Sequence, residues 1–348
     1  MTRGPLRAWS AGRGFAWRSG LARIVRPAVD RHRGNRIGAV GITAKIAPAW
    51  CNPCIIAFTA PMTDSSFPSL VPTGWLAAHL DDPALRIFDC SVTFLPTPTG
   101  MRMAAGRAIW AEGHVPGAGL IDIAGELSDP DSSMSLMMPP AEQFAEAMGR
   151  AGVGPGTRVV LYDTGMNIWA TRVWWMLRAM GFDDAAVLDG GFRQWISEGR
   201  PLSEEECVYP TMTFEAHPRA GVFVNKQAVQ QALGDPGVCL INALPEHDHA
   251  GMVSRGGRAG HIPGSVNVPT GSLIDPASAT YLPLEALREK FRAVGALDAR
   301  QVICYCAGGI TATTDAFHLV RLGAENVSVY DASLAEWATD PDLLLTTD

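Results

Sequence analysis

The sequence has few charged residues, no regular framework of cysteines and no long uninterrupted apolar run. Charged side chains make up 18% of the 348 residues and hydrophobic ones 47%, a balance typical of a soluble globular chain and not of a disordered one. The seven cysteines have no regular spacing, which argues against a secreted, disulfide-stapled fold and predicts reduced thiols in the cytoplasm. The net charge of −7 gives no support to nucleic-acid binding.

Acidic residues are almost absent from the first 61 positions. Asp30 is the one acid there against ten Lys and Arg, which leaves 18 basic and 34 acidic side chains, a net of −16, for residues 62–348. Three prolines interrupt the uncharged stretch 46–62, so it is a poor membrane span. The Arg-rich composition of residues 1–61 as a whole resembles that of a transit peptide. We expect residues 1–61 to be a basic extension, either disordered or upstream of a true start at Met62.

A long internal repeat divides the chain. The stretch "EGHVPGAGLIDI" (112–123) is echoed by "AGHIPGSVNVPT" (259–270), and residues 158–195 are echoed by residues 301–337. The offset is 143 positions before the central loop of the longer match and 142 after it, so the first copy of that loop has one extra residue. Because this period is too long for a solenoid, it predicts two similar domains in tandem.

Short apolar strands alternate with helices in both halves. The predicted strands are 85–90, 119–123, 158–162, 185–189, 238–242, 265–269, 301–305 and 327–331, and proline-led helices are predicted at 140–152 and 283–295. The alternation predicts an α/β fold in which each domain is a mostly parallel sheet with helices on both faces. The stretch 204–220 has the proline and charge content of a linker, so we expect domains at 62–203 and 221–348.

The stretch "YCAGGITATTDAF" (305–317) places a thiol directly before two glycines and a predicted helix. Thr311 is a good N-cap residue, and the preceding "QVICY" predicts a short buried strand. Cys306 would then lie at the carboxyl end of a parallel strand, where functional sites of such sheets occur. Loop amides and the positive end of the helix favour an anion there, either a thiolate or a bound substrate. The first half has Asp163 at the matching position, so only the second half would carry a sulfur nucleophile.

Other interpretations of the cysteines and histidines follow from the same residues. A cysteine phosphatase shares the strand–loop–helix arrangement, but it needs an arginine six positions after the cysteine, where this chain has Ala312. We expect Cys304 to lie in the core; the alternative is that Cys304 is a redox partner of Cys306. His247 and His249 are metal-ligand types without a third ligand, so no metal site is predicted.

From about Leu70 to its end, the chain resembles the tandem-domain rhodaneses, which are thiosulfate and 3-mercaptopyruvate sulfurtransferases. The motifs "GHVPGA", "ATRVWWMLRAMG", "VLDGGFRQW", "GHIPGSVNVP" and "YCAGGITAT" follow one another across both halves in the order of that family. The resemblance implies a non-catalytic first domain and a catalytic second domain with Cys306 as the nucleophile. It also implies that Arg172 reaches into the cleft between the domains to bind an anionic substrate. The loop residues implied to contact substrate are Ala307, Gly308, Gly309, Ile310 and Thr311.

The resemblance further implies sulfur transfer through a persulfide on Cys306. The thiolate would take sulfur from a small anionic donor, and cyanide, a thiol or a protein thiol would accept it. Neither a metal nor an organic cofactor is needed, and neither nucleic acid nor a membrane is an expected partner. Two departures leave the donor open, because "NAL" (242–244) replaces the usual Asp-Ala-Arg and the loop has neither basic side chains nor a Gly-Ser pair. A non-catalytic rhodanese-like binding or regulatory module is the alternative.

Overall fold

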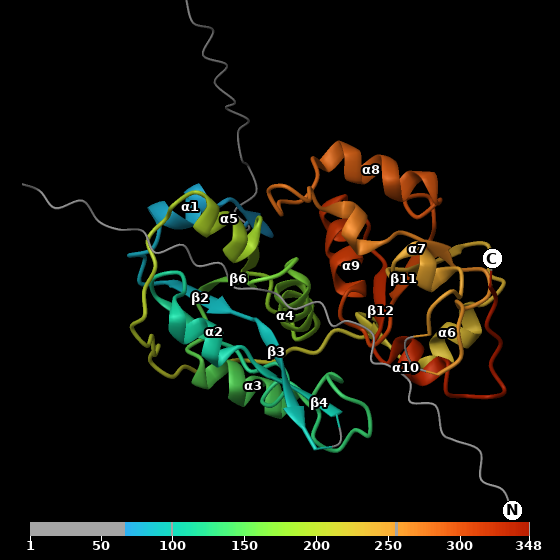
Figure 1. Ribbon diagram of the computed structural model, residues 1–348, viewed down its shortest axis with the longest axis horizontal. Coiled ribbons are helices and arrows are strands. Elements are labelled where there is room, and N and C mark those ends of the chain that lie inside the picture. The colour runs from blue at the N-terminus through green and yellow to red at the C-terminus, as the bar shows by residue number, and fades with distance from the viewer. Residues whose placement is uncertain (1–66, 99, 255–256, 348) are drawn as a thin grey trace, which may run out of the picture. The chain divides into compact units, whose positions relative to one another are not determined.

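The computed structural model describes residues 67–98, 100–254 and 257–347 (Figure 1). The prediction of a basic extension at 1–61 lies outside these ranges. Within them, no helix is both long and apolar enough to cross a membrane. The repeat predicted from the sequence appears as two α/β halves of the same topology.

The first half is built around a five-stranded sheet in which every neighbouring pair of strands is parallel. The strand order is β1-β7-β6-β2-β5. The strands are β1 (Leu70–Val71), β2 (Leu85–Asp89), β5 (Ala118–Leu120), β6 (Arg158–Tyr162) and β7 (Ala185–Leu188). The central strand β6 is a continuous apolar run that is buried after its first residue, as expected for a strand with helices on both faces.

The second half repeats this sheet strand for strand. Written from the same edge as the first sheet, its order is β8-β12-β11-β9-β10, so β8 corresponds to β1 and β11 to β6. All four neighbouring pairs are parallel. The strands are β8 (Phe223–Val224), β9 (Val238–Asn242), β10 (Val266–Asn267), β11 (Gln301–Tyr305) and β12 (Val327–Tyr330). The match between the two orders confirms the prediction of two tandem domains with mostly parallel sheets.

Helices follow the strands in both halves (Figure 1). They are α1 (Thr73–Ala78), α2 (Arg107–Glu112), α3 (Ala141–Arg150), α4 (Ile168–Ala179), α5 (Gly191–Ser197), α6 (Lys226–Ala232), α7 (Glu246–His249), the 3-10 helix η1 (Thr270–Leu273), α8 (Leu284–Ala293), α9 (Ala312–Arg321) and α10 (Ser333–Trp337). The predicted helix α3 buries Phe144, Ala147 and Met148, which share one face because they are three and four positions apart.

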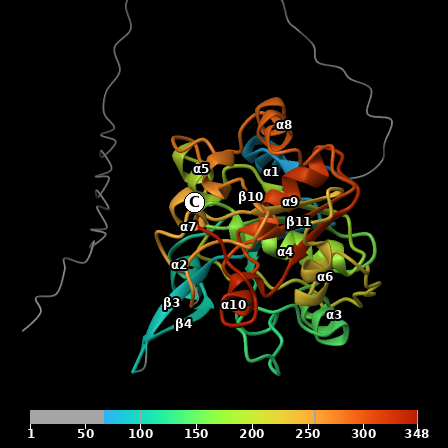
Figure 2. The same cartoon turned by 90° about the vertical axis from the view of Figure 1, so that its right-hand side faces the viewer.

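An antiparallel hairpin in the first half was not predicted. It consists of β3 (Val92–Thr97) and β4 (Gly100–Ala105), with Val92 paired to Ala105. Figures 1 and 2 show the hairpin extending away from the parallel sheet of that half. Apolar side chains of the hairpin are exposed, with 56% of the surface of Phe94 and 62% of that of Met101 accessible to solvent. The hairpin therefore lacks the pattern of buried apolar residues by which a strand is predicted from sequence.

The segment 204–220 connects the two sheets, but it is not a free tether. Tyr209 Oη donates to Gly117 O at 2.6 Å and accepts from Ile87 N at 2.9 Å. Phe214 packs into the core with 6% of its surface exposed. The segment therefore forms an ordered covering of the first half.

The two halves meet through α4 and α9, which pack against each other. Thr171 on α4 contacts two hydroxyls of α9, with its Oγ1 3.1 Å from Thr313 Oγ1 and 2.9 Å from Thr314 Oγ1. All three threonines are fully buried. A hydroxyl cluster thus joins the helices at the point where α9 begins.

A reciprocal pair of aspartate contacts also joins the halves. Asp331, after β12, accepts from Met138 N at 2.8 Å, and Asp189, after the equivalent strand β7, accepts from Tyr281 N at 2.9 Å. Each aspartate thus binds a backbone amide of the opposite half. The contact has approximate two-fold character because the two halves share one topology.

Candidate active site

Cys306 follows directly on β11, at the carboxyl end of a central strand of the second sheet. Only 2% of the surface of Cys306 is exposed to solvent. Cys306 O accepts from Leu334 N at 3.1 Å, and Ala307 O accepts from Ala335 N at 2.8 Å. The start of the loop is therefore fixed to the first turn of α10.

The loop enters α9 at Thr311, which occupies the predicted N-cap position. Its side chain makes no capping hydrogen bond, and its φ of −61° and ψ of −29° are already helical, so the predicted cap through the side chain is wrong. Instead, Thr313 Oγ1 donates to Ile310 O at 2.7 Å. Thr311 Oγ1 is buried and has no hydrogen-bond partner among the described residues.

Most amides of the loop are free to bind an anion. Among the described residues, no acceptor is found for the backbone N–H groups of Ala307, Gly308, Ile310, Thr311 and Ala312. Ala307, Gly308 and Thr311 are half-buried. Unpaired amides gathered at the start of a helix form an anion site, because N–H dipoles and the helix dipole point the same way.

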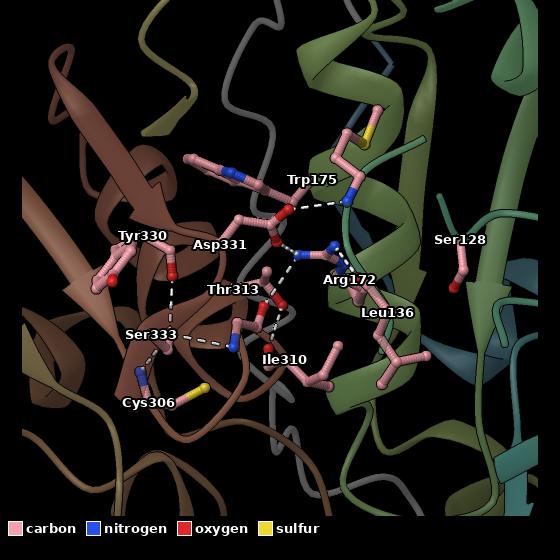
Figure 3. A network of polar contacts seen from close by, with 12 residues as sticks. Ser128, Leu136, Arg172, Trp175, Cys306, Ile310, Thr313, Tyr330, Asp331 and Ser333 are labelled. Atoms are coloured by element: carbon pink, nitrogen blue, oxygen red, sulfur yellow. Dashed lines mark hydrogen bonds and ion pairs between the residues drawn. The ribbon is translucent and has the colours of Figure 1, made fainter. Parts of the chain in front are cut away.

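Ser333 holds the two remaining amides of the loop (Figure 3). Its Oγ accepts from Cys306 N at 3.0 Å and from Gly309 N at 3.1 Å, and it donates to Tyr330 O at 2.7 Å. Ser333 has a φ of +52°, a left-handed conformation that strains a non-glycine residue. No sequence motif singles out Ser333, although the repeat aligns it with Gly191, whose φ of +54° marks the same turn.

The two glycines of the loop have different roles. Gly309 has a φ of +74°, and a Cβ there would lie 2.2 Å from Asp331 O, so no other residue fits without moving the backbone. A Cβ on Gly308 would have no atom within 4 Å. Gly309 is therefore required by packing, whereas Gly308 has room for a side chain.

Arg172 differs from the expectation that it reaches into an open cleft. Its side chain is fully buried, and its Nη1 donates to Asp331 Oδ1 at 2.6 Å and to Gly309 O at 3.2 Å (Figure 3). Its Nη2 donates to Leu136 O at 2.6 Å. The guanidinium is thus surrounded by protein oxygens of both halves, and in this structure it positions the loop through Gly309.

The matching loop of the first half binds a carboxyl group of its own. The carboxylate of Asp163, at the position equivalent to Cys306, accepts from Gly165 N at 2.7 Å and from Asn167 N and Trp169 N, each at 2.9 Å. Burial raises the pKa of Asp163, and these backbone hydrogen bonds oppose that rise. The first-half loop therefore shows that the amides of a strand–loop–helix turn of this chain can bind carboxyl oxygens.

Asn167 performs in the first half what Ser333 performs in the second. Its Oδ1 accepts from Asp163 N at 3.3 Å, and its Nδ2 donates to Leu188 O, the counterpart of Tyr330 O, at 2.8 Å. Asn167 lies within the loop, where its φ is +59°. The longer loop of the first half, seen as a change of offset in the repeat, thus supplies its own bridging side chain.

A cavity of about 430 Å³ lies next to this network in the first half. It is lined by the hairpin residues Arg102 and Met103 and by the segment 124–136, which supplies four serine hydroxyls. Leu136 forms part of its wall, and Leu136 O and Gly309 O bind the same guanidinium. Arg172 therefore connects one wall residue of the cavity to the loop.

The remaining predicted residues take structural positions. Cys304 is fully buried on β11, which confirms its place in the core, and burial raises the pKa of its thiol well above the ordinary value. His249 stacks on His261 with ring centroids 3.7 Å apart. In the described part of the chain, no three His, Cys, Asp or Glu side chains converge on a point that could hold a metal ion.

Comparisons with protein families, with individual proteins and with solved structures all match this chain to rhodanese-like proteins. Residues 73–198 and 225–340 each match the family model described as a rhodanese-like domain. The chain is 32% identical over 277 residues to a 3-mercaptopyruvate sulfurtransferase of Escherichia coli (strain K12), covering 78% of this chain and 96% of that protein. It is 33% identical over 284 residues to a thiosulfate sulfurtransferase of Rattus norvegicus, covering 77% and 91%. A crystal structure of SseA from Escherichia coli superposes with a TM-score of 0.65 at 31% identity, covering 76% of this chain and 98% of that one.

Proposed function

Because this chain belongs to the rhodanese family, with two of its domains in tandem, we propose that it transfers a sulfane sulfur through a persulfide on Cys306. The observation that carries the proposal is the Cys306 loop, in which the cysteine precedes five amides that have no acceptor in the described part of the chain, at the start of α9. The sulfurtransferase relatives support the same reaction type. The first half, with Asp163 in place of the cysteine, has no sulfur nucleophile at that position.

The first step loads the enzyme. The Cys306 thiolate attacks the outer sulfur of the donor, so a sulfur–sulfur bond forms while the bond from that sulfur to the donor breaks. The electron pair of the broken bond leaves with the donor, as sulfite from thiosulfate or as the enolate of pyruvate from 3-mercaptopyruvate. In the second case the thiol proton of the donor ends on the enolate carbon.

The second step returns the enzyme to its starting state. A thiolate or cyanide attacks the terminal sulfur of the persulfide, and the sulfur–sulfur bond breaks with its electron pair returning to Cys306. Such a two-step covalent course gives ping-pong kinetics. Negative charge lies on the cysteine sulfur or the terminal sulfur throughout, where amides that are already oriented stabilise it at no reorganisation cost.

The loop residues divide into two roles. We assign contact with the sulfur anion to the amides of Ala307, Gly308, Ile310 and Thr311, and the unpartnered hydroxyl of Thr311 supports its role as a further donor. Both backbone groups of Gly309 are already used, its amide by Ser333 and its carbonyl by Arg172. Gly309 and Arg172 are therefore positioning residues in this proposal.

The donor we favour is a small mercapto acid of the 3-mercaptopyruvate type. The loop has no basic side chain, and the described residues that line the neighbouring cavity include one cation, Arg102, and one acid, Asp129. One guanidinium and several serine hydroxyls suit a single carboxylate with a carbonyl better than the compact dianion thiosulfate. The acceptor would be cyanide, a low-molecular thiol or a protein thiol. The five cysteines of the described ranges are all free, which fits the reducing cytoplasm as the setting.

Intact-mass spectrometry tests the proposal directly. Wild-type protein mixed with 3-mercaptopyruvate or thiosulfate should gain one sulfur atom, and cyanide or a thiol should remove it. Peptide mapping should place the added sulfur on Cys306, and Cys306→Ser should gain none. A wild-type protein that gains no sulfur from either donor would instead be the non-catalytic binding module.

A further inference from the structure

Asp315 is a buried acid that the proposed mechanism does not use. It lies in the first turn of α9, four residues after Thr311, and it is fully buried. Across the described ranges no cation forms an ion pair with it, and its Oδ2 has no hydrogen-bond partner. A charged carboxylate buried in this way would be costly, so its protonation state needs an explanation.

Thr270 on η1 connects this acid to the active loop. Its Oγ1 lies 2.9 Å from Asp315 Oδ1 and 3.1 Å from Thr311 O, and Thr311 is the last residue of the loop. Both of those atoms are acceptors when Asp315 is ionised. A threonine hydroxyl has a single proton, so it can satisfy only one of the two at a time.

A proton on Asp315 satisfies both contacts at once. The acid O–H then donates to Thr270 Oγ1, and the hydroxyl of Thr270 donates to Thr311 O. Oδ2 becomes the carbonyl oxygen of the neutral acid, a group that tolerates the lack of a partner better than a charged oxygen does. Burial raises the pKa of Asp315 well above its ordinary value, in agreement with this arrangement.

We propose that Asp315 is a positioning residue that, as a neutral acid, fixes the end of the active loop through Thr270. The proposal rests on the sulfur transfer assigned to Cys306. Thr311 O also accepts from Thr314 N at 3.0 Å, so a neutral Asp315 adds the Thr270 hydroxyl as a second donor to this carbonyl. This second contact ties the end of the loop to η1 and holds the adjoining amides in place. An ionised Asp315 would withdraw the Thr270 proton from that carbonyl and add a negative charge beneath an anion-binding loop.

The groups that surround Asp315 are consistent with a neutral acid. Cys304 on β11 is close enough that a charge on Asp315 would raise the pKa of its thiol. Cys306, at the start of the loop, would carry a negative charge in the reaction. Arg172 of the neighbouring helix α4 is bound to Asp331 instead. His318, one turn further along α9, is buried, and burial lowers its pKa well below the ordinary value, so it supplies no counter-charge.

Two pairs of variants in the full chain test the inference. Asp315→Asn keeps a hydrogen-bond donor toward Thr270, whereas Asp315→Val removes it. In the second pair, Thr270→Ser keeps the bridging hydroxyl and Thr270→Val removes it. We expect both Val variants to lower the kcat of persulfide formation about tenfold with KM changed less than twofold, and we expect Asn and Ser to stay within about twofold of wild type. If Asp315→Val does not fold, Thr270→Val carries the same test. The inference is overturned if Asp315→Asn is as slow as Asp315→Val, or if both Val variants match wild type.

Alkylation of Cys306 by iodoacetamide tests the charge of Asp315 without any sulfur donor. If Asp315 is neutral, Asp315→Asn removes no charge, and its alkylation rate at pH 6 and pH 8 should stay within twofold of wild type. A rate increased fivefold or more at pH 6 would show an ionised Asp315 and overturn the inference. This measurement also separates the two proposals, because it remains decisive if wild-type protein forms no persulfide and sulfur transfer itself fails.

Discussion

Arg172 Nη1 donates to Asp331 Oδ1 at 2.6 Å, which joins a helix of the first half to the strand end beside the active loop of the second. The same nitrogen donates to Gly309 O, so the geometry of the loop depends on a residue of the other half. The guanidinium also lies over the ring of Phe223, 4.7 Å from its centroid. The first half therefore contributes structure to the active loop although its own loop lacks the cysteine.

Arg172→Ala should destabilise the protein and slow the reaction. The change leaves Gly309 O, Leu136 O and Asp331 Oδ1 without the Arg172 donor and removes the counter-charge of the mostly buried Asp331, and the loss of one partner of a buried pair costs about 3–5 kcal/mol. Urea unfolding and steady-state kinetics measure the two effects. Arg172→Lys, which keeps the charge but cannot reach all three oxygens, should give an intermediate result. A raised KM with unchanged stability would contradict the positioning role and restore direct binding of the donor.

Alanine at the two loop glycines should have opposite effects. Gly309→Ala places a Cβ 2.2 Å from Asp331 O in a left-handed backbone, so persulfide formation should fall at least a hundredfold. Gly308→Ala meets no atom within 4 Å and should keep most of the activity. Intact-mass measurement of sulfur loading compares the pair directly. Equal loss in both variants would show that the open space at Gly308 is needed by the substrate.

The two cysteines around Tyr305 should behave differently. Cys306→Ser should abolish sulfur loading without loss of fold, because the change replaces one atom at the loop. Cys304→Ala should retain most of the activity, since its side chain is packed in the sheet and contacts no described group of the loop by hydrogen bond. Circular dichroism verifies the fold of both variants. Turnover in well-folded Cys306→Ser protein would move the chemistry to another residue.

A basic side chain at Gly308 should change the preference for donors. The wild-type loop has no cation, and a lysine at Gly308 has space to place one beside the sulfur site. Gly308→Lys should therefore raise kcat/KM for thiosulfate relative to 3-mercaptopyruvate, with Gly308→Ala as the control for size. A wild-type enzyme that already prefers thiosulfate a hundredfold, about 2.7 kcal/mol, would show that loop charge does not select the donor.

Asp89 should make the stability depend on pH. Burial raises the pKa of Asp89 from 3.8 to about 6, so the folded state holds its proton more tightly than the unfolded state. The contribution of protonated Asp89 to the free energy of unfolding is complete below about pH 4 and is lost as the pH rises through 6. For a difference of two pKa units this contribution is on the order of 3 kcal/mol. Asp89→Asn keeps an acceptor for Ser91 N and should remove this loss.

Urea unfolding of wild type and Asp89→Asn between pH 4 and 7 measures the effect. The difference in unfolding free energy should grow in favour of the variant across this range. Glu142→Gln changes an exposed acid and should leave the pH dependence as it is in wild type. Parallel curves for wild type and Asp89→Asn would show that Asp89 does not hold a proton at pH 5.

The sequence by itself determined eight strands of the two parallel sheets, the tandem repeat and the position of Cys306, the proposed nucleophile. "RVVLY" and "QVICY" are short apolar runs bounded by turn residues, and each forms the central strand of its sheet. Cys306 follows the second of these runs directly, so its place at a strand end needs no knowledge of distant residues. These features are local, because strand and helix periodicity depend on neighbouring residues in the chain.

The tertiary structure alone decided how the loop is held. Arg172 binds oxygens of Leu136, Gly309 and Asp331, which are 36, 137 and 159 positions away from it. Ser333 bonds the amide of a residue 27 positions earlier, and in the first half Asn167 does this work from within the loop. No local pattern encodes such partners, because the packing of α4 on α9 and the ends of separate strands bring them together. A buried arginine and a substrate-binding arginine therefore look the same in the sequence, and only the folded chain shows which oxygens surround the guanidinium.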